Sequence, residues 1–99
     1  MDHLTNDLGV LEQKSEILKA LAHPVRLCIT RRLLNAEVSN VTAMQSCLGV
    51  PQSTISQHLA KLKAAGIIEG EREGVKINYF VVNEDAKRII SALFENDLG

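Results

Sequence analysis

The sequence predicts a mostly α-helical protein of 99 residues that carries one two-stranded β-hairpin, in the order four helices, two strands and a final helix. Two observations lead to this fold class. Apolar residues recur at three- and four-residue steps over most of the chain, as in amphipathic helices. Between about residues 67 and 82 they alternate instead, as in strands. A chain this short buries a modest share of its apolar surface, so dimerisation is an expected further source of stability.

Charge is unevenly distributed along this chain, whose formal net charge is −1. Residues 26–80 contain seven basic and four acidic side chains. Residues 1–25 and 81–99 each contain two basic and four acidic ones. A basic centre between acidic ends is typical of a middle that faces nucleic acid and termini that face away from it.

Composition also bears on the cellular compartment. The chain has no run of 18 apolar residues, so no membrane span is expected. Its acidic, polar start does not resemble a secretory signal, and we therefore expect a cytoplasmic protein. Cys28 and Cys47 are too few for a disulfide scaffold and are expected to be reduced.

The first two helices are predicted from leucine spacing and from a proline. A helix over about residues 4–21 is expected because leucines recur there at helical steps. Pro24 suits the first turn of a second helix that runs to about residue 35, with His23 as its cap. The leucines of the first helix are Leu4, Leu8, Leu11, Leu18 and Leu21.

A helix-turn-helix is expected over about residues 42–65. Thr42 and Gln45 have the spacing of a capping box, which predicts a short helix beginning at Thr42 and ending at Gly49. Pro51 then begins a helix over residues 51–64. Two short helices joined by so tight a turn indicate a helix-turn-helix. The core stripe of the second helix consists of Ile55, Leu59 and Leu62.

A β-hairpin, here called the wing, is expected over about residues 67–82. Glu73 and Gly74 are expected to form its turn. The alternating residues of its second strand are Val75, Ile77, Tyr79 and Val81. Asn83 can cap a last helix over about residues 84–96. A helix-turn-helix followed by this hairpin makes a winged helix-turn-helix, which we expect to be one domain over residues 1–99.

The polar face of the 51–64 helix is the predicted DNA-binding surface. Glutamine can bond bidentately to adenine, and serine can bond to base edges or phosphates. These side chains lie in the N-terminal turns, which contact bases in recognition helices. Basic side chains late on this helix and near the tip of the wing are expected to contact phosphates or a minor groove. The predicted DNA-binding residues are Gln52, Ser53, Thr54, Ser56, Gln57, His58, Lys61, Arg72 and Lys76.

Four stretches of the chain resemble the ArsR family of bacterial winged-helix repressors. They are Ala22-His-Pro-Val-Arg-Leu27, Val50-Pro-Gln-Ser-Thr-Ile-Ser-Gln-His-Leu59, Ala65-Gly-Ile-Ile68 and Arg72-Glu-Gly74. They keep the family's order and spacing over about residues 15–95, and the second is most similar to short members that lack metal sites. The resemblance implies a homodimer formed by the helices at about 4–21 and 84–96. It also implies repression through an inverted-repeat operator in double-stranded DNA, contacted by residues 52–57 and the wing.

Metal sites of the family are not kept in this sequence. Asn40 and Thr42 stand where one family site has a Cys-x-Cys pair. Asp85 is followed by Lys87 where another has Asp-x-His, and no histidine follows His58. Because a zinc site needs three or four nitrogen or sulfur ligands, we expect neither a metal nor another cofactor. His58 itself is expected to hydrogen-bond locally or to approach a phosphate.

Two alternatives remain open at the level of sequence. Cys28 and Cys47 are either small core residues or a thiol switch whose oxidation distorts the helix-turn-helix. A winged helix can also act as a protein-interaction module without a DNA target, although such a module normally exposes apolar or aromatic anchors. An enzyme is not expected, because no phosphate-binding loop, nucleophile elbow or metal cluster is evident. The sequence does not identify an effector.

Overall fold

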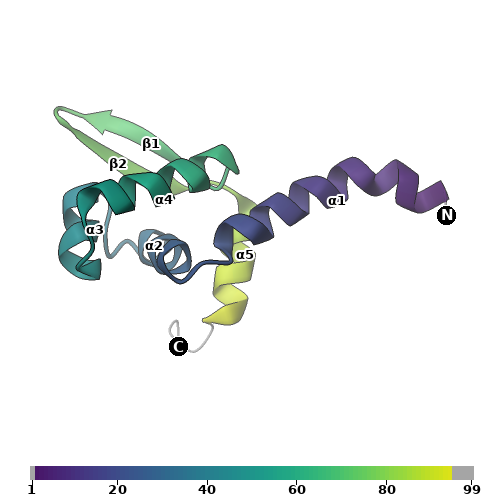
Figure 1. The fold of residues 1–99 in the computed structure, drawn as a ribbon, viewed down its shortest axis with the longest axis horizontal. Helices are drawn as coiled ribbons and strands as arrows, with labels where there is room; N and C mark the ends of the chain where they lie inside the picture. The colour runs from purple at the N-terminus through teal and green to yellow at the C-terminus, as the bar shows by residue number, and fades with distance from the viewer. Residues whose placement is uncertain (1, 95–99) are drawn as a thin grey trace.

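The computed structural model describes residues 2–94, with side chains from residue 7 onward. Within this part the elements are α1 (Asp2–Leu21), α2 (Pro24–Leu34), α3 (Val41–Leu48), α4 (Gln52–Ala64), β1 (Ile68–Glu73), β2 (Lys76–Val81) and α5 (Glu84–Leu93). Figure 1 shows α2 beside α4, with the hairpin projecting from one end of the molecule and α1 from the other. None of these helices is long and apolar enough to cross a membrane. The predicted order of elements is confirmed.

The core lies where α2, α4 and the base of the wing meet. Ile29 of α2 and both Ile55 and Leu62 of α4 are completely buried, so the predicted stripe of α4 does face inward. Thr30 is buried as well, and its hydroxyl donates to the carbonyl of Arg26 at 2.8 Å. Because this hydroxyl has a partner, its burial leaves no unpaired polar group.

Side-chain caps define the starts of α2 and α5. The Nδ1 atom of His23 accepts a hydrogen bond from the Val25 N–H at 3.1 Å. The Oδ1 atom of Asn83 accepts one from the Ala86 N–H at 2.8 Å. Each cap satisfies a backbone donor that has no partner within its helix. Both predicted caps are confirmed.

The start of α3 differs from the prediction. Asn40 is the capping residue, and its Oδ1 accepts from the Ala43 N–H at 2.9 Å. Thr42 lies within the first turn and is exposed, so the predicted capping box at Thr42 and Gln45 is wrong. Asparagine caps at least as well as threonine, and Asn40 has the extended backbone that a cap requires (φ −125°, ψ 170°).

A three-residue turn joins α3 to α4. Gly49 adopts the left-handed conformation (φ 68°, ψ 23°), and its N–H donates to the Gln45 carbonyl at 2.9 Å. Pro51 occupies the capping position of α4, where its carbonyl accepts from the N–H groups of Thr54 and Ile55. A residue with a Cβ would be strained at Gly49, so glycine allows the chain to reverse within so few residues.

The wing is an antiparallel hairpin whose register runs from Ile68↔Val81 to Glu73↔Lys76. Gly74, with φ at +64°, and Val75 form the turn between the strands. Glu73 pairs with Lys76 at the end of β1, so the predicted turn at Glu73 and Gly74 is wrong for Glu73. Val75, which is 98% exposed, precedes the start of β2 at Lys76, so its predicted place in the second strand is wrong. Apolar alternation alone does not show where a two-residue turn ends.

Two backbone hydrogen bonds attach the wing to the rest of the molecule. The Tyr79 N–H donates to the Ser39 carbonyl at 2.8 Å, just before α3. At the base of the hairpin, the Ile67 N–H donates to the Leu62 carbonyl of α4 at 3.0 Å. The wing is therefore held beside the helix-turn-helix.

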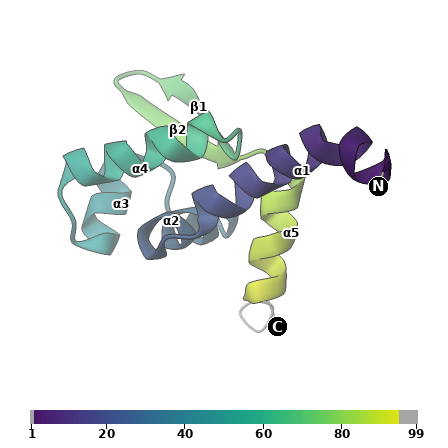
Figure 2. The same ribbon diagram turned by 45° about the vertical axis from the view of Figure 1, so that its right-hand side comes forward.

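The leucine stripe of α1 lies mostly outside the core. Leu8, Leu11 and Leu18 are 50%, 45% and 54% exposed, while the side chain of Leu4 lies outside the described residues. The N-terminal half of α1 extends away from the other elements in both views (Figures 1 and 2). The residues of α1 that reach the core are Ile17, Ala20 and Leu21.

Charged and aromatic contacts position α5 against α1 and α2. Lys14 of α1 pairs with Asp85 of α5, and this hydrogen bond holds the pKa of Asp85 below its ordinary value. The guanidinium of Arg31 in α2 lies 4.2 Å from the centre of the Phe94 ring. The helix predicted to reach residue 96 ends at Leu93, and residues 95 and 96 lie outside the described part.

The burial of Leu62 generates a stability prediction. We expect Leu62→Ala to lower the free energy of unfolding by about 2–5 kcal/mol, because it removes buried methyl groups and leaves a cavity. Val75→Ala, on the exposed turn, is the control and should change it by less than about 0.5 kcal/mol. Urea unfolding at one fixed protein concentration measures both. Equal effects of the two substitutions would contradict the described core.

Candidate nucleic-acid interface

The exposed face of α4 carries small polar side chains. Ser53 and Gln57 are four positions apart, on the side of the helix opposite the buried stripe, and both are exposed. Gln52 and Ser56 are exposed on the flank of the same helix. Thr54 is half-buried. The N-terminal half of α4 therefore presents several hydrogen-bonding groups to solvent.

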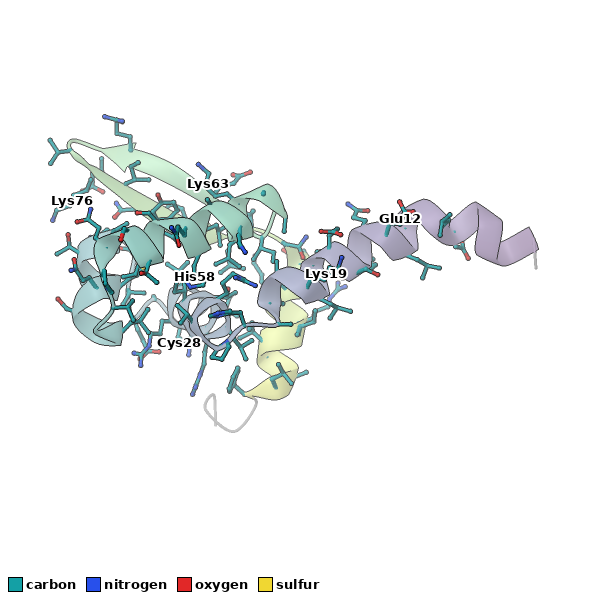
Figure 3. All side chains as sticks on the ribbon, viewed as in Figure 1. Glu12, Lys19, Cys28, His58, Lys63 and Lys76 are labelled. Carbon is teal, nitrogen blue, oxygen red and sulfur yellow. The ribbon has the colours of Figure 1, made fainter. Side chains whose placement is uncertain are left out.

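A shallow hollow of about 230 Å³ separates the start of α4 from the wing. Gln52 lines it from α4, Thr42 from α3, and Lys76, Ile77 and Tyr79 from β2. Figure 3 shows Lys76 at the end of the molecule where α3 and α4 meet. The structure thus brings Lys76 to the N-terminal turn of α4, although the two are more than 20 residues apart in sequence.

The two basic residues of the wing lie on opposite faces of the hairpin. Arg72 pairs in register with Ile77, whereas Lys76 pairs with Glu73 on the other face, because neighbouring strand residues point in opposite directions. Both basic side chains are exposed. Glu73 accepts a hydrogen bond from the Asn78 amide at 2.8 Å. The sequence alone does not show that Arg72 and Lys76 lie on opposite faces, because it does not give the register of the two strands.

His58 points from α4 toward α2 and does not lie on the exposed face (Figure 3). Its Nδ1 atom lies 3.2 Å from Nη1 of Arg26, and its ring centre lies 4.5 Å from that of His23. Because arginine can only donate, Nδ1 of His58 is the acceptor and carries no proton. The predicted local hydrogen bond is present, and a DNA contact by His58 stays a prediction.

The surroundings of His58 lower its pKa below the ordinary histidine value. Burial is the largest cause, followed by the charges of His23, Arg26 and Lys61. Arg26 is fixed in turn, since its Nε donates to the Ala20 carbonyl at 2.6 Å. Arg26 was not among the site residues predicted from the sequence. The signal was present, because Arg26 lies in the first stretch that resembles the family.

The two cysteines lie in different environments. Cys28 is half-buried in α2, and its Sγ accepts a hydrogen bond from Nε of Arg32 at 3.2 Å. Cys47 in α3 is exposed, so the interpretation of both thiols as core residues is wrong for Cys47. The hydrogen bond that Arg32 donates to Cys28 is the largest cause of a raised pKa of Arg32. The thiol switch stays a prediction.

The positions that correspond to metal ligands in the family have other structural roles. Asn40 caps α3. Asp85 forms ion pairs with Lys14 and Arg88. Among the described residues, no group of three or more His, Cys, Asp or Glu side chains is placed to hold a metal ion.

Comparison with known proteins identifies the family. A family described as a helix-turn-helix domain matches residues 21–71, which run from the end of α1 into the wing. The transcriptional repressor PagR of Bacillus anthracis is 40% identical over 83 residues, covering 84% of this chain and 83% of PagR. The chain belongs to the ArsR family of winged helix-turn-helix repressors. The predicted resemblance is therefore confirmed.

Solved structures and a further relative agree with this family. The crystal structure of PagR matches with a TM-score of 0.79 at 38% identity, covering 87% of this chain and 98% of PagR. The homodimeric winged helix-turn-helix DNA-binding domain of Mb0332 from Mycobacterium bovis matches with a TM-score of 0.77 at 32% identity, covering 88% and 80%. The repressor SmtB of Mycobacterium tuberculosis is 38% identical over 81 residues, which cover 82% of this chain and 59% of SmtB.

The environment of His58 generates a prediction about pH. Because the folded state holds the pKa of His58 down, the unfolded chain binds the proton more readily. We therefore expect the free energy of unfolding to fall as the pH drops through about 6.5, and to be unaffected by His58 above that range. His58→Gln, which keeps a hydrogen-bond acceptor, should reduce this fall.

Urea unfolding at pH 7 and pH 5 measures the change in each protein. NMR titration of the wild-type histidine ring signals reports the pKa directly. A His58 pKa at or above 6.5 would contradict the described contacts.

Proposed function

We propose that this ArsR-family protein represses transcription by binding, as a homodimer, to an inverted-repeat operator in double-stranded DNA. The exposed polar face of α4 is the observation that carries this proposal. Its N-terminal turns present Ser53 and Gln57 to solvent, and glutamine and serine can hydrogen-bond to base edges in the major groove. An α-helix fits that groove, and recognition helices contact bases through these same turns.

The wing and the end of α4 supply the contacts that hold the protein in register on the duplex. Lys76 lies beside the N-terminal turn of α4, where it can bind a phosphate next to the bases that this turn contacts. Lys61 is exposed further along α4. Phosphate contacts position a protein without reading sequence. Base contacts by α4 and phosphate contacts by these lysines therefore have separate roles.

The proposed dimer interface combines α1 with α5. Leu8 and Leu11 are exposed on the half of α1 that extends from the body, Leu18 is exposed on its other half, and Leu93 of α5 is 60% exposed. Ile17, Leu18 and Ile89 line an apolar hollow of about 220 Å³ between these two helices. A second copy would cover these surfaces from water and present two α4 helices to successive major grooves. The bound dimer would then block transcription.

Substitutions in α4 and the wing test the division between base and phosphate contacts. We expect Gln57→Ala to reduce the preference for operator over scrambled DNA by about 1–3 kcal/mol, because it removes a bond to a base. Lys76→Ala should weaken binding to both DNAs alike. It should also reduce the slope of log affinity against log salt concentration by about one, because one phosphate contact is lost. Fluorescence anisotropy at several salt concentrations measures both, with the DNA upstream of the protein's own gene as operator.

Two results would count against this proposal. If Gln57→Ala weakened both DNAs equally, α4 would not read bases through that residue. If the wild-type protein did not prefer the upstream DNA even at low salt, the proposal of a sequence-specific repressor would be overturned.

The exposed stripe of α1 generates a prediction about assembly. We expect Leu18→Glu to convert a dimer into a monomer, because an unpaired carboxylate would be buried in the interface. Val75→Glu places the same charge on the exposed turn of the wing and should leave the dimer intact. Light scattering during size-exclusion chromatography measures the mass of each protein. A dimeric Leu18→Glu variant would show that this stripe is not at the interface.

A further inference from the structure

A second basic surface joins Lys61, one of the predicted DNA-binding residues, to residues of α1 and α2 that were not predicted to contact DNA. It is a hollow of about 520 Å³ between α1, α2 and the C-terminal end of α4. Three of the described side chains that line it are cationic, and one is a carboxylate. Residues that line it include Glu16, Lys19, Arg26, Lys61, Ala64 and Ala65. The hollow therefore carries a net positive charge.

Arg26 is held in place at this hollow. Its Nε donates to the Ala20 carbonyl and its Nη1 lies in hydrogen-bond contact with His58, which uses two of the five N–H groups of the guanidinium. A guanidinium that is already oriented loses less entropy when it binds an anion. The charges of Arg26 and Lys61 also contribute to the lowered pKa of His58, after burial and the charge of His23.

The remaining charges at the hollow can rearrange. Nζ of Lys19 lies 3.6 Å from Oε1 of Glu16, and both side chains are well exposed. An exposed ion pair of this kind contributes little to stability, so Lys19 can exchange its partner for another anion. Figure 3 shows Lys19 on the C-terminal half of α1, which is the half that contacts α4.

The hollow begins where the exposed face of α4 ends. Ser53, Gln57 and Ala64 share one face of the helix, because they are separated by four and by seven residues. Ala64 and Ala65 at its C-terminal end have small side chains, which leave room above them. A recognition helix inserts its N-terminal turns into the groove, so its other end lies nearer the DNA backbone.

We propose that this hollow binds a backbone phosphate of the operator, held by Lys19, Arg26 and Lys61. This inference rests on the proposed DNA binding and adds to it a contact from α1 and α2. Arginine and lysine are the side chains that bind phosphate oxygens through charge-assisted hydrogen bonds. The contact would position α4 on the duplex without reading bases.

Three charge substitutions of the full-length protein test this site. Lys19→Gln removes a cation of the hollow, and Glu16→Gln removes its carboxylate. Lys87→Gln is the matched control, since it makes the same change as Lys19→Gln on α5, outside the hollow. Arg26 is unsuited to the test because its bonds to Ala20 and His58 also support the fold.

Anisotropy titrations of the upstream DNA and of a scrambled duplex measure the effect. We expect Lys19→Gln to weaken binding to both, on the order of tenfold at 0.1 M salt. The slope of log affinity against log salt concentration should fall by about one. Glu16→Gln should tighten binding to both DNAs. Lys87→Gln should change neither the affinity nor the salt dependence appreciably.

The outcomes separate this inference from the proposed function. If the wild-type protein prefers its upstream DNA but Lys19→Gln behaves like Lys87→Gln, the phosphate site is overturned and the repressor remains. If Lys19→Gln loses binding together with its dimer mass or its thermal transition, the phosphate site is overturned too. If the wild-type protein binds neither DNA, the proposed function itself fails.

Discussion

The burial of three residues on one side of α4 sets the geometry of the whole interface. Ile55, Leu59 and Leu62 are packed into the core, so α4 cannot rotate about its axis without exposing them to water. Each fully buried side chain of this size stabilises the fold by about 1.5–3 kcal/mol relative to exposure. The opposite side, with Ser53 and Gln57, must therefore face solvent. The rotation of α4 is thus determined by the core and not by the DNA.

Local backbone chemistry places α4 relative to its neighbours. Asn40 defines where α3 begins, and the left-handed Gly49 ends it. The turn restricts how α3 and α4 can lie relative to each other, since it contains only three residues. The Tyr79 N–H then attaches the wing to Ser39, just ahead of α3. Helix-turn-helix and wing consequently form one continuous surface.

A chain with a net charge of −1 is compatible with DNA binding when its cations are gathered in a few places. Lys76 lies at one end of α4, and Lys61 with Arg26 at the other. Such an arrangement favours phosphates at both edges of the groove while leaving the middle of α4 neutral for base contacts. With so few cations, the proposed complex would neutralise few phosphates, which favours moderate affinity over strong non-specific binding.

The order of elements, the stripe of α4 and the turn at Gly49 could all be predicted from the sequence, because apolar spacing and turn residues are local signals. Local signals did not distinguish Asn40 from Thr42 as a cap, and they did not exclude Val75 from a strand. The contact between His58 and Arg26 spans 32 positions. Packing of α1 and α2 against α4 creates that contact and the basic hollow beside it. The local spacing of residues does not predict contacts between positions so far apart in the sequence.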